Sequence, residues 1–73
     1  MRETPTELIA ANVRGEVAKK RIRQAEIAER LGLNQQQVSR RLNGQVPISA
    51  AELRELAAML EVPSGTLLGE VPA

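Results

Sequence analysis

Cysteine, histidine, phenylalanine, tyrosine and tryptophan are all missing from this 73-residue sequence. Without Cys and His, the chain lacks the usual ligands of a zinc finger, a redox-active thiol and the Ser-His or Cys-His pair of a nucleophilic enzyme. Without aromatic rings, it lacks the stacking platforms with which common single-stranded RNA and DNA modules hold unpaired bases. We therefore expect a protein that is not an enzyme and that uses no metal, no other cofactor and no small-molecule substrate.

The sequence also has little apolar material in any one place. Its nearest approach to a signal core, Leu8–Val13, is interrupted by Arg14 and falls far short of the roughly 20 residues that span a membrane. We expect a cytoplasmic protein with no membrane partner. At this length the chain predicts a single domain, 1–73, near the lower limit at which one hydrophobic core keeps a chain folded. A second copy would add buried surface, so we also expect a homodimer.

Positive charge is concentrated in the middle of the chain, although the formal net charge is only +1. Residues 1–18 carry a net charge of −1, residues 19–41 of +5 and residues 42–73 of −3. A local excess of Lys and Arg of this size suggests that an anionic partner binds the middle segment. A solvated basic face is the alternative, and charge alone does not decide between the two.

Signals that start and stop helices recur along the chain, and no stretch alternates apolar and polar residues for long enough to predict a strand. Thr4-Pro5-Thr6-Glu7 has the form of a capping box and predicts a helix over about 5–20. A second helix is expected over about 24–31. A third is expected to begin after Asn34, its N-cap, and to stop at Gly44.

Ser49-Ala50-Ala51-Glu52 forms a second capping box and predicts a fourth helix that buries Leu53, Leu56, Ala57 and Leu60. Ser64 is expected to cap a short final turn that carries Leu67 and Leu68, which either close the core or contact a second copy. Residues 70–73 are expected to be frayed. Together these signals predict an all-α fold, a compact bundle of four to five helices.

Only Gly32-Leu33-Asn34 separates the second and third predicted helices. A three-residue turn containing glycine between two short helices is typical of a helix-turn-helix, here at 24–43. Gly32 allows the backbone to turn, Leu33 anchors the turn in the core, and Asn34 caps the next helix. Ordinary helical corners in small bundles use similar turns, so the turn alone leaves both interpretations open.

The third predicted helix has an apolar stripe and an opposite face suited to reading base edges. At 100° per residue, Val38 and Leu42 share one narrow stripe that faces the core. The opposite face has no acidic residue, and its side chains can bond to bases, since Gln pairs with adenine and Arg with guanine. This face consists of Gln36, Arg40 and Asn43, flanked by Gln35 and Ser39.

The run from Ile22 to Gly44 resembles the helix-turn-helix of the phage repressor and Cro (Xre-type) regulators, and the likeness extends over about residues 8–69. Its most specific parts are Gln24-x-x-Ile27-Ala28, Leu31-Gly32-Leu33 and the stop at Asn43-Gly44. The resemblance implies a compact five-helix, lambda-repressor-like DNA-binding domain. It also implies a cytoplasmic regulator of transcription that pairs as a homodimer on double-stranded operator DNA.

The resemblance further implies roles for individual residues. In the recognition helix, 35–43, the base-reading positions match Gln35, Gln36 and Arg40. Gln24 matches a residue that holds the DNA backbone together with the N-terminus of its helix. Other contacts to the DNA backbone are expected because a residue matches a position of the family, lies beside the reading face or carries positive charge. These residues are Lys19, Arg23, Asn34, Gln37, Ser39, Arg41 and Asn43.

Three features depart from the pattern of this family. Arg23 stands where relatives usually carry a Ser or Thr cap, and losing such a cap costs about 1 kcal/mol of helix stability. Val17 and Leu42 replace a buried Arg–Glu pair of several relatives, an apolar exchange that need not reduce stability. Residues 45–48 carry no basic side chain. Only their backbone amides are then expected to approach phosphate, and binding is expected to depend more on residues 19–23.

Two other functions stay open on the sequence alone. The same fold serves antitoxins and excision-type DNA-binding proteins. A helical adaptor that binds only protein, through the surface from Leu53 to Leu68, would leave the basic segment merely solvated. Salt-dependent binding to any duplex separates a DNA-binding protein from such an adaptor.

Overall fold

In the residues that it describes, the computed structural model has five helices in this order: α1 (Pro5–Lys20), α2 (Gln24–Leu31), α3 (Gln35–Leu42), α4 (Ala50–Leu60) and α5 (Ser64–Leu68). The structure describes residues 4–69, and this part of the chain contains no strand. The predicted all-α fold is confirmed, with five helices. Residues 70–73, predicted to be frayed, lie outside the described residues.

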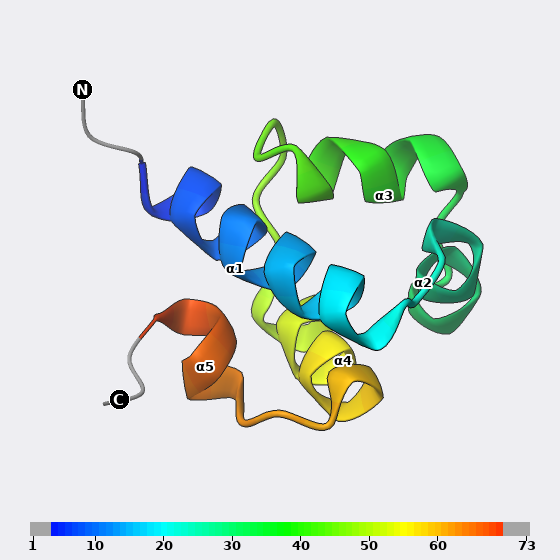
Figure 1. Cartoon of the computed structure of the whole chain (residues 1–73). Coiled ribbons are helices and arrows are strands. Elements are labelled where there is room, and N and C mark those ends of the chain that lie inside the picture. The colour runs from blue at the N-terminus through cyan, green and yellow to red at the C-terminus, as the bar shows by residue number, and fades with distance from the viewer. Residues whose placement is uncertain (1–3, 70–73) are drawn as a thin grey trace.

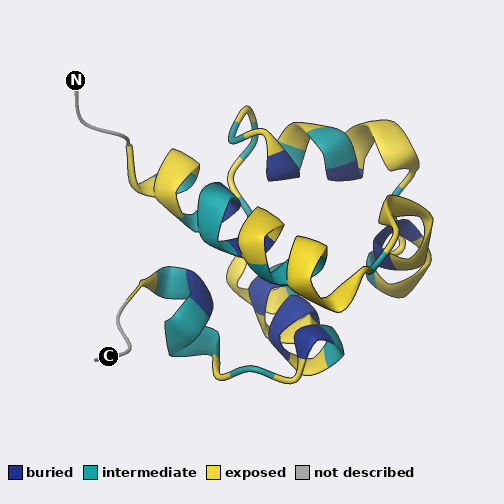
Figure 2. Ribbon diagram, viewed as in Figure 1, coloured by how far each residue is buried: buried dark blue, intermediate teal, exposed yellow. Residues whose placement is uncertain are grey.

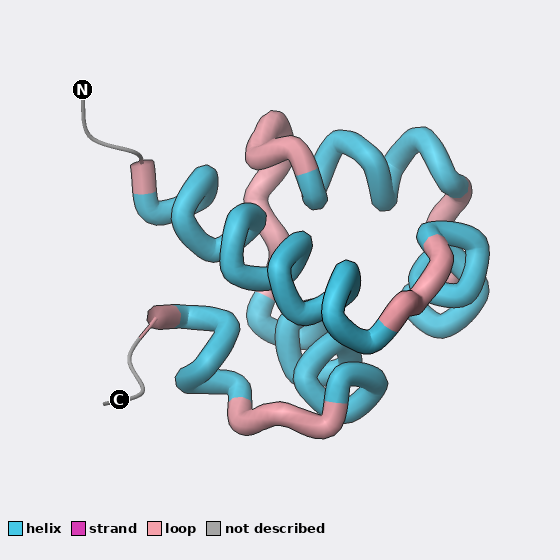
Figure 3. Tube along the Cα trace, in the orientation of Figure 1, coloured by secondary structure: helices cyan, strands magenta, loops and turns pink. Residues whose placement is uncertain are grey.

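The helix α1 runs through the middle of the molecule, with α3 on one side of it and α4 and α5 on the other (Figure 1). The helix α2 follows the C-terminal end of α1 and packs on both α3 and α4. The described residues measure 30 × 26 × 21 Å along the principal axes. The longest connection joins α3 to α4 over residues 43–49 (Figure 3). This arrangement leaves the side of α3 that faces away from α1 uncovered.

Each helix contributes at least one buried side chain to a common apolar core (Figure 2). Among residues 4–69, no polar or charged residue is buried. The prediction that α4 buries its four inward-facing residues is confirmed. The largest fully buried side chains are Val13, Ile27, Val38, Leu56, Leu60 and Leu67.

The structure separates the roles of Leu67 and Leu68. Leu67 is 0 % exposed and closes the core, and its carbonyl accepts a hydrogen bond of 3.0 Å from Asn12 Nδ2 of α1. Leu68 is half-buried and lines a shallow groove of about 390 Å³, together with residues that include Ile9 and Leu53. Of the two leucines, Leu68 alone is placed where a second copy could reach it.

Three helices begin with a capping box, in which the N-cap side chain accepts from the backbone N–H three residues later and that residue's side chain accepts from the N-cap N–H. Arg23 makes no capping hydrogen bond at the start of α2, as predicted. The prediction that Ser64 caps the last helix is wrong. Ser64 is the first residue of α5, because the non-helical cap conformation falls on Pro63 (φ −64°, ψ 147°). The three boxes pair Thr4 with Glu7, Asn34 with Gln37, and Ser49 with Glu52.

Two of these boxes contain a carboxylate whose pKa the fold lowers. Backbone and side-chain hydrogen bonds from Thr4 lower the pKa of Glu7. Burial raises the pKa of Glu52, but the Ser49 N–H together with the hydrogen bond and charge of Arg41 outweighs it, so the pKa lies below its usual 4.5. Because the folded-state pKa is lowered, the ionised carboxylates stabilise the fold at neutral pH. That contribution is lost as the pH falls through the folded-state pKa.

Leu67→Ala is expected to lower the free energy of unfolding by about 2–5 kcal/mol, because the removed atoms leave a cavity in the core. Leu8→Ala removes the same atoms from a side chain that is 45 % exposed. This control is expected to cost about 0.5 kcal/mol or less. Urea unfolding of both variants measures the difference, and equal losses would contradict the placement of Leu67 in the core.

Glu52→Gln is expected to lower the thermal midpoint at neutral pH, because the variant lacks the ionised carboxylate that the folded state favours. The difference from the unmodified chain should shrink once the pH falls below about 4.5, where the unfolded chain binds protons. Thermal unfolding followed by circular dichroism across this range gives the result. Glu7→Gln, in a capping box without an ion pair, should show a pH-dependent loss from the box alone, and the additional loss in Glu52→Gln measures the contribution of Arg41. A difference that is constant with pH would contradict this origin of the stability.

Candidate nucleic-acid interface

The helices α2 and α3 meet through a tight turn whose backbone is held by local hydrogen bonds. Gly32 ends α2 in the left-handed conformation (φ 69°), which glycine adopts without strain. The N–H of Leu33 then donates to the carbonyl of Ala28 at 2.9 Å. The capping box of α3 follows at once, with Gln37 N donating to Asn34 Oδ1 at 2.8 Å and Asn34 N to Gln37 Oε1 at 2.9 Å. The predicted helix-turn-helix geometry is confirmed.

One face of α3 is accessible, and it is the face predicted to read bases. On the opposite side, Val38 and Leu42 are 1 % and 5 % exposed and hold the helix against the core. Gln35, Gln36 and Arg40 are all exposed. Figure 2 shows the exposed side of α3 pointing away from α1 and the buried side pointing toward it. All three predicted base-contacting residues are therefore accessible: Gln36 and Arg40, four residues apart, share the face opposite the core, and Gln35 lies in the exposed first turn.

Three of the predicted backbone contacts lie where α1 ends and α2 begins. Arg23 and Gln24 are exposed at the N-terminus of α2, and the side chain of Arg23 is not used for capping. Lys19, with a side chain that is 71 % exposed, pairs with Glu16 at 3.2 Å. A pair three residues apart on one helix with an exposed lysine contributes little stability, so Lys19 can exchange its partner for a phosphate at small cost.

Four other predicted backbone contacts lie along α3 and already make local hydrogen bonds. The capping box uses the side-chain oxygens of Asn34 and Gln37, which leaves their amide nitrogens as donors. At the other end of the helix, Asn43 is exposed and its Nδ2 donates to Oγ of the half-buried Ser39 at 3.4 Å. Asn43 lies on the face predicted to read bases, and Asn34, Gln37 and Ser39 lie beside it.

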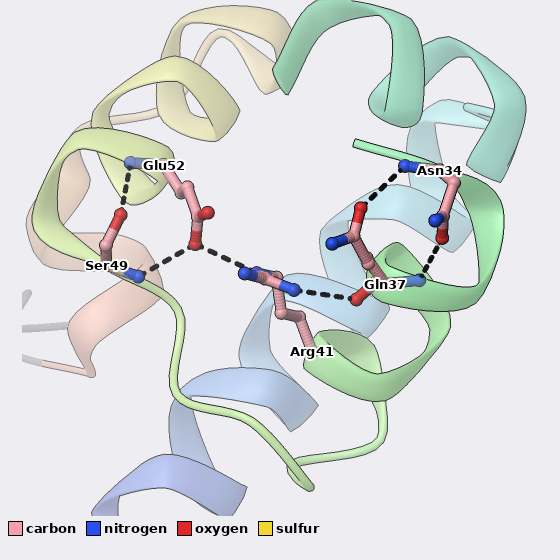
Figure 4. Close-up of polar contacts among 5 residues, drawn as sticks. All are labelled: Asn34, Gln37, Arg41, Ser49 and Glu52. Carbon is pink, nitrogen blue, oxygen red and sulfur yellow. Dashed lines mark hydrogen bonds and ion pairs between the residues drawn. The ribbon is translucent and has the colours of Figure 1, made fainter. Parts of the chain in front are cut away.

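Arg41, the remaining predicted backbone contact, is turned toward α4. Its Nε atom pairs with Glu52 Oε1 at 3.0 Å, and its Nη1 atom donates to the carbonyl of Gln37 at 3.1 Å (Figure 4). Both side chains of the ion pair are 18 % exposed. The pair turns the guanidinium toward α4 and partly neutralises its charge, so it competes with the predicted role.

The connection between α3 and α4 differs from its predicted role. The sequence predicts that the amides of residues 45–48 approach phosphate. In the structure, the N–H groups of Gln45 and Val46 both donate to the carbonyl of Arg40, at 2.9 and 3.4 Å. The last carbonyls of a helix need such donors because no later turn supplies them. The prediction is wrong for these two amides, which close the C-terminus of α3 instead.

Two arginines outside the predicted set lie beside the backbone contacts. Arg14 and Arg21 line a shallow groove of about 440 Å³ that Gln24 and Asn43 also line. Arg14 Nη1 donates to the carbonyl of Leu42 and so joins the end of α3 to α1. Arg21 could have been found from the basic run at 19–23. Arg14 gives no such signal, because its position depends on how α1 packs against α3.

The chemistry that this surface offers is hydrogen bonding and positive charge. The amides of Gln35 and Gln36 and the guanidinium of Arg40 match the donors and acceptors of base edges, and nearby cations match phosphates. In residues 4–69, no group of acidic side chains is arranged to hold a metal ion. No helix of this part is long and apolar enough to cross a membrane.

Comparison with known proteins agrees with this geometry. A family model described as helix-turn-helix matches residues 16–67, from within α1 to within α5. No curated protein and no solved structure matches the chain. The matched family consists of DNA-binding, non-enzymatic domains. The chain therefore belongs to the helix-turn-helix family of the phage repressor and Cro (Xre-type) proteins, and it is a DNA-binding helix-turn-helix regulator.

Proposed function

We propose that this protein is a transcriptional regulator of the repressor or Cro type that recognises a particular operator sequence in double-stranded DNA. The accessible face of α3 carries this proposal, because Gln36 and Arg40 are exposed there while Val38 and Leu42 are buried behind it, and Gln35 is exposed in the first turn. The major groove of B-DNA, about 12 Å wide, admits an α-helix. A helix with this division of faces can enter the groove while the fold stays intact.

Base recognition is assigned to the side chains on this face of α3. The Gln36 amide can form two hydrogen bonds with adenine, and the Arg40 guanidinium can form two with guanine. Gln35 lies in the first turn of α3, the end of a recognition helix that approaches the bases most closely. No acidic residue occurs between Gln35 and Asn43, so phosphate oxygens do not repel this helix.

Backbone binding is assigned to the start of α2 and the end of α1. Gln24 is the first residue of α2, where free N–H groups and the positive end of the helix dipole favour a phosphate. Arg23 and Lys19 add positive charge at the same place. These contacts fix the register of the protein on the duplex and carry no sequence information themselves.

We infer that two copies bind one operator as a homodimer. A single α3 reaches only a few base pairs, whereas two copies related by a twofold axis read half-sites about 34 Å apart on one face of the duplex. Additional buried surface would also help a chain with so small a core. We place the protein in the cytoplasm, where it is associated with the nucleoid when bound to DNA, and we assign it no catalytic activity.

Selection of bound duplexes from a random pool tests this function. The recovered duplexes should share a motif with two symmetric halves whose centres lie about 10 base pairs apart. A shared motif without symmetry would contradict the homodimer and leave specific binding in place. Binding without any shared motif would contradict the recognition of a specific operator sequence and favour a nonspecific DNA-binding role. No salt-dependent binding to any duplex would favour the protein-binding adaptor.

Gln36→Ala and Arg40→Ala are each expected to weaken binding to the selected duplex by about 1–3 kcal/mol and to relax the preference at one base position. Each substitution removes a pair of base contacts from an exposed side chain, so the thermal midpoint should change little. Fluorescence anisotropy on the selected duplex and on single-base variants measures both effects. Arg54→Ala, in an exposed position of α4, is the control for the loss of one positive charge.

Lys19→Ala and Arg23→Ala are expected to act differently, weakening binding to all duplexes alike. Each should lower the slope of log affinity against log salt by about one, because one fewer counterion is released from the DNA. The same titrations at several salt concentrations give the slope. An unchanged slope would show that the substituted residue does not contact the DNA backbone.

A further inference from the structure

The helix α3 carries the reading face but has few anchors of its own. It is eight residues long, and its buried residues are Val38 and Leu42. A helix this short is not stable alone, so the direction of its axis depends on contacts with other helices. A binding site must hold its side chains within about 0.5 Å and 10–20° of the productive geometry. The contacts that fix the axis of α3 therefore matter for discrimination between sequences.

In residues 4–69, the ion pair between Arg41 and Glu52 is the one that joins α3 to another helix. The Nε–Oε1 distance is 3.0 Å, and both side chains are 18 % exposed. Partial burial reduces the solvent screening that makes surface pairs weak. The pair between Arg30 of α2 and Glu55 of α4 provides the contrast, since its side chains are 47 % and 48 % exposed.

A capping box holds the Glu52 end of this ion pair, and a backbone carbonyl of α3 holds the Arg41 end (Figure 4). Glu52 Oε1 also accepts from Ser49 N at 2.9 Å, and Glu52 N donates to Ser49 Oγ at 3.1 Å. At the other end, Arg41 Nη1 donates to the carbonyl of Gln37, the residue that completes the box of Asn34. Figure 4 shows one continuous chain of polar contacts from the start of α4 to the start of α3. Arg41 therefore meets a carboxylate that α4 has already oriented.

We propose that Arg41 and Glu52 are positioning residues, which set the orientation of α3 in the major groove and thereby the choice of DNA sequence. This inference rests on the proposed function, and it assigns Arg41 no contact with phosphate. A phosphate contact by Arg41 predicts the opposite response to loss of Glu52. Removing the acid would then release Arg41 and strengthen binding to every duplex.

Arg41→Lys and Glu52→Gln separate these two roles. Lys keeps the charge and can still contact phosphate, but it lacks the planar fork that serves Glu52 and the Gln37 carbonyl together. Gln keeps an acceptor for the Ser49 N–H, so α4 stays capped, but it lacks the charge that pairs with Arg41. The matched controls, which alter the exposed pair between α2 and α4, are Arg30→Lys and Glu55→Gln.

Each variant is titrated at several salt concentrations with the duplex selected from the random pool and with an unrelated duplex of equal length. Both test variants are expected to lower the ratio of specific to nonspecific affinity at least about fivefold, with an unchanged salt slope on the unrelated duplex. The double variant should lose about as much as the single variant with the larger loss, and less than the sum of the two losses, because both substitutions break the same contact. The controls should keep the ratio within about twofold.

Two results would overturn the positioning role. A pair that only stabilises the fold would lower the thermal midpoints of the test variants and leave the affinity ratio unchanged well below those midpoints. A phosphate contact would show as an unchanged ratio for Arg41→Lys and a salt slope lowered by about one for Arg41→Ala. Failure of the unmodified chain to bind any duplex would overturn the proposed function itself, and that titration precedes all comparisons between variants.

Discussion

The burial of Val38 and Leu42 beneath α3 is the constraint on which the exposed face of this helix depends. These residues lie four apart and are 1 % and 5 % exposed, so the rotation of the helix about its own axis is fixed. With that rotation fixed, Gln36 and Arg40 have to face solvent. A rotation by one residue, about 100°, would bring polar side chains into an apolar core that has no partner for them. Packing behind the helix thus determines which chemistry is presented in front of it.

The starts of α1, α3 and α4 could be predicted because capping is decided within about four residues of the chain. Thr4, Asn34 and Ser49 each precede, by three positions, a Glu or Gln that completes the box. Three positions after Ser64 stands Leu67, whose side chain cannot accept a hydrogen bond from the Ser64 N–H. The N-cap is the preceding residue, Pro63. Residue patterns also sufficed for the open face of α3, because helical periodicity alone separates its two sides.

The roles of Arg14, Arg41 and the connection after α3 could not be predicted, because they depend on partners from other elements. Charge alone makes Arg41 equally suited to a phosphate or to Glu52, and only the placement of α4 brings Glu52 within 3.0 Å. Arg14 reaches the carbonyl of Leu42 across 28 positions of the chain. The N–H groups of Gln45 and Val46 likewise bond to the carbonyl of Arg40, because the last carbonyls of α3 have no donor within the helix.

The connection between α3 and α4 has a consequence for how such a regulator can evolve. Residues 45–48 offer no cation, and two of their amides are already bonded, so this side of the domain adds little electrostatic attraction to DNA. In the proposed binding mode, a lysine acquired there would lengthen the time spent on any duplex while Gln36 and Arg40 continue to choose the sequence. Residence on DNA and choice of site are therefore separately adjustable, and selection can tune one while the other is conserved.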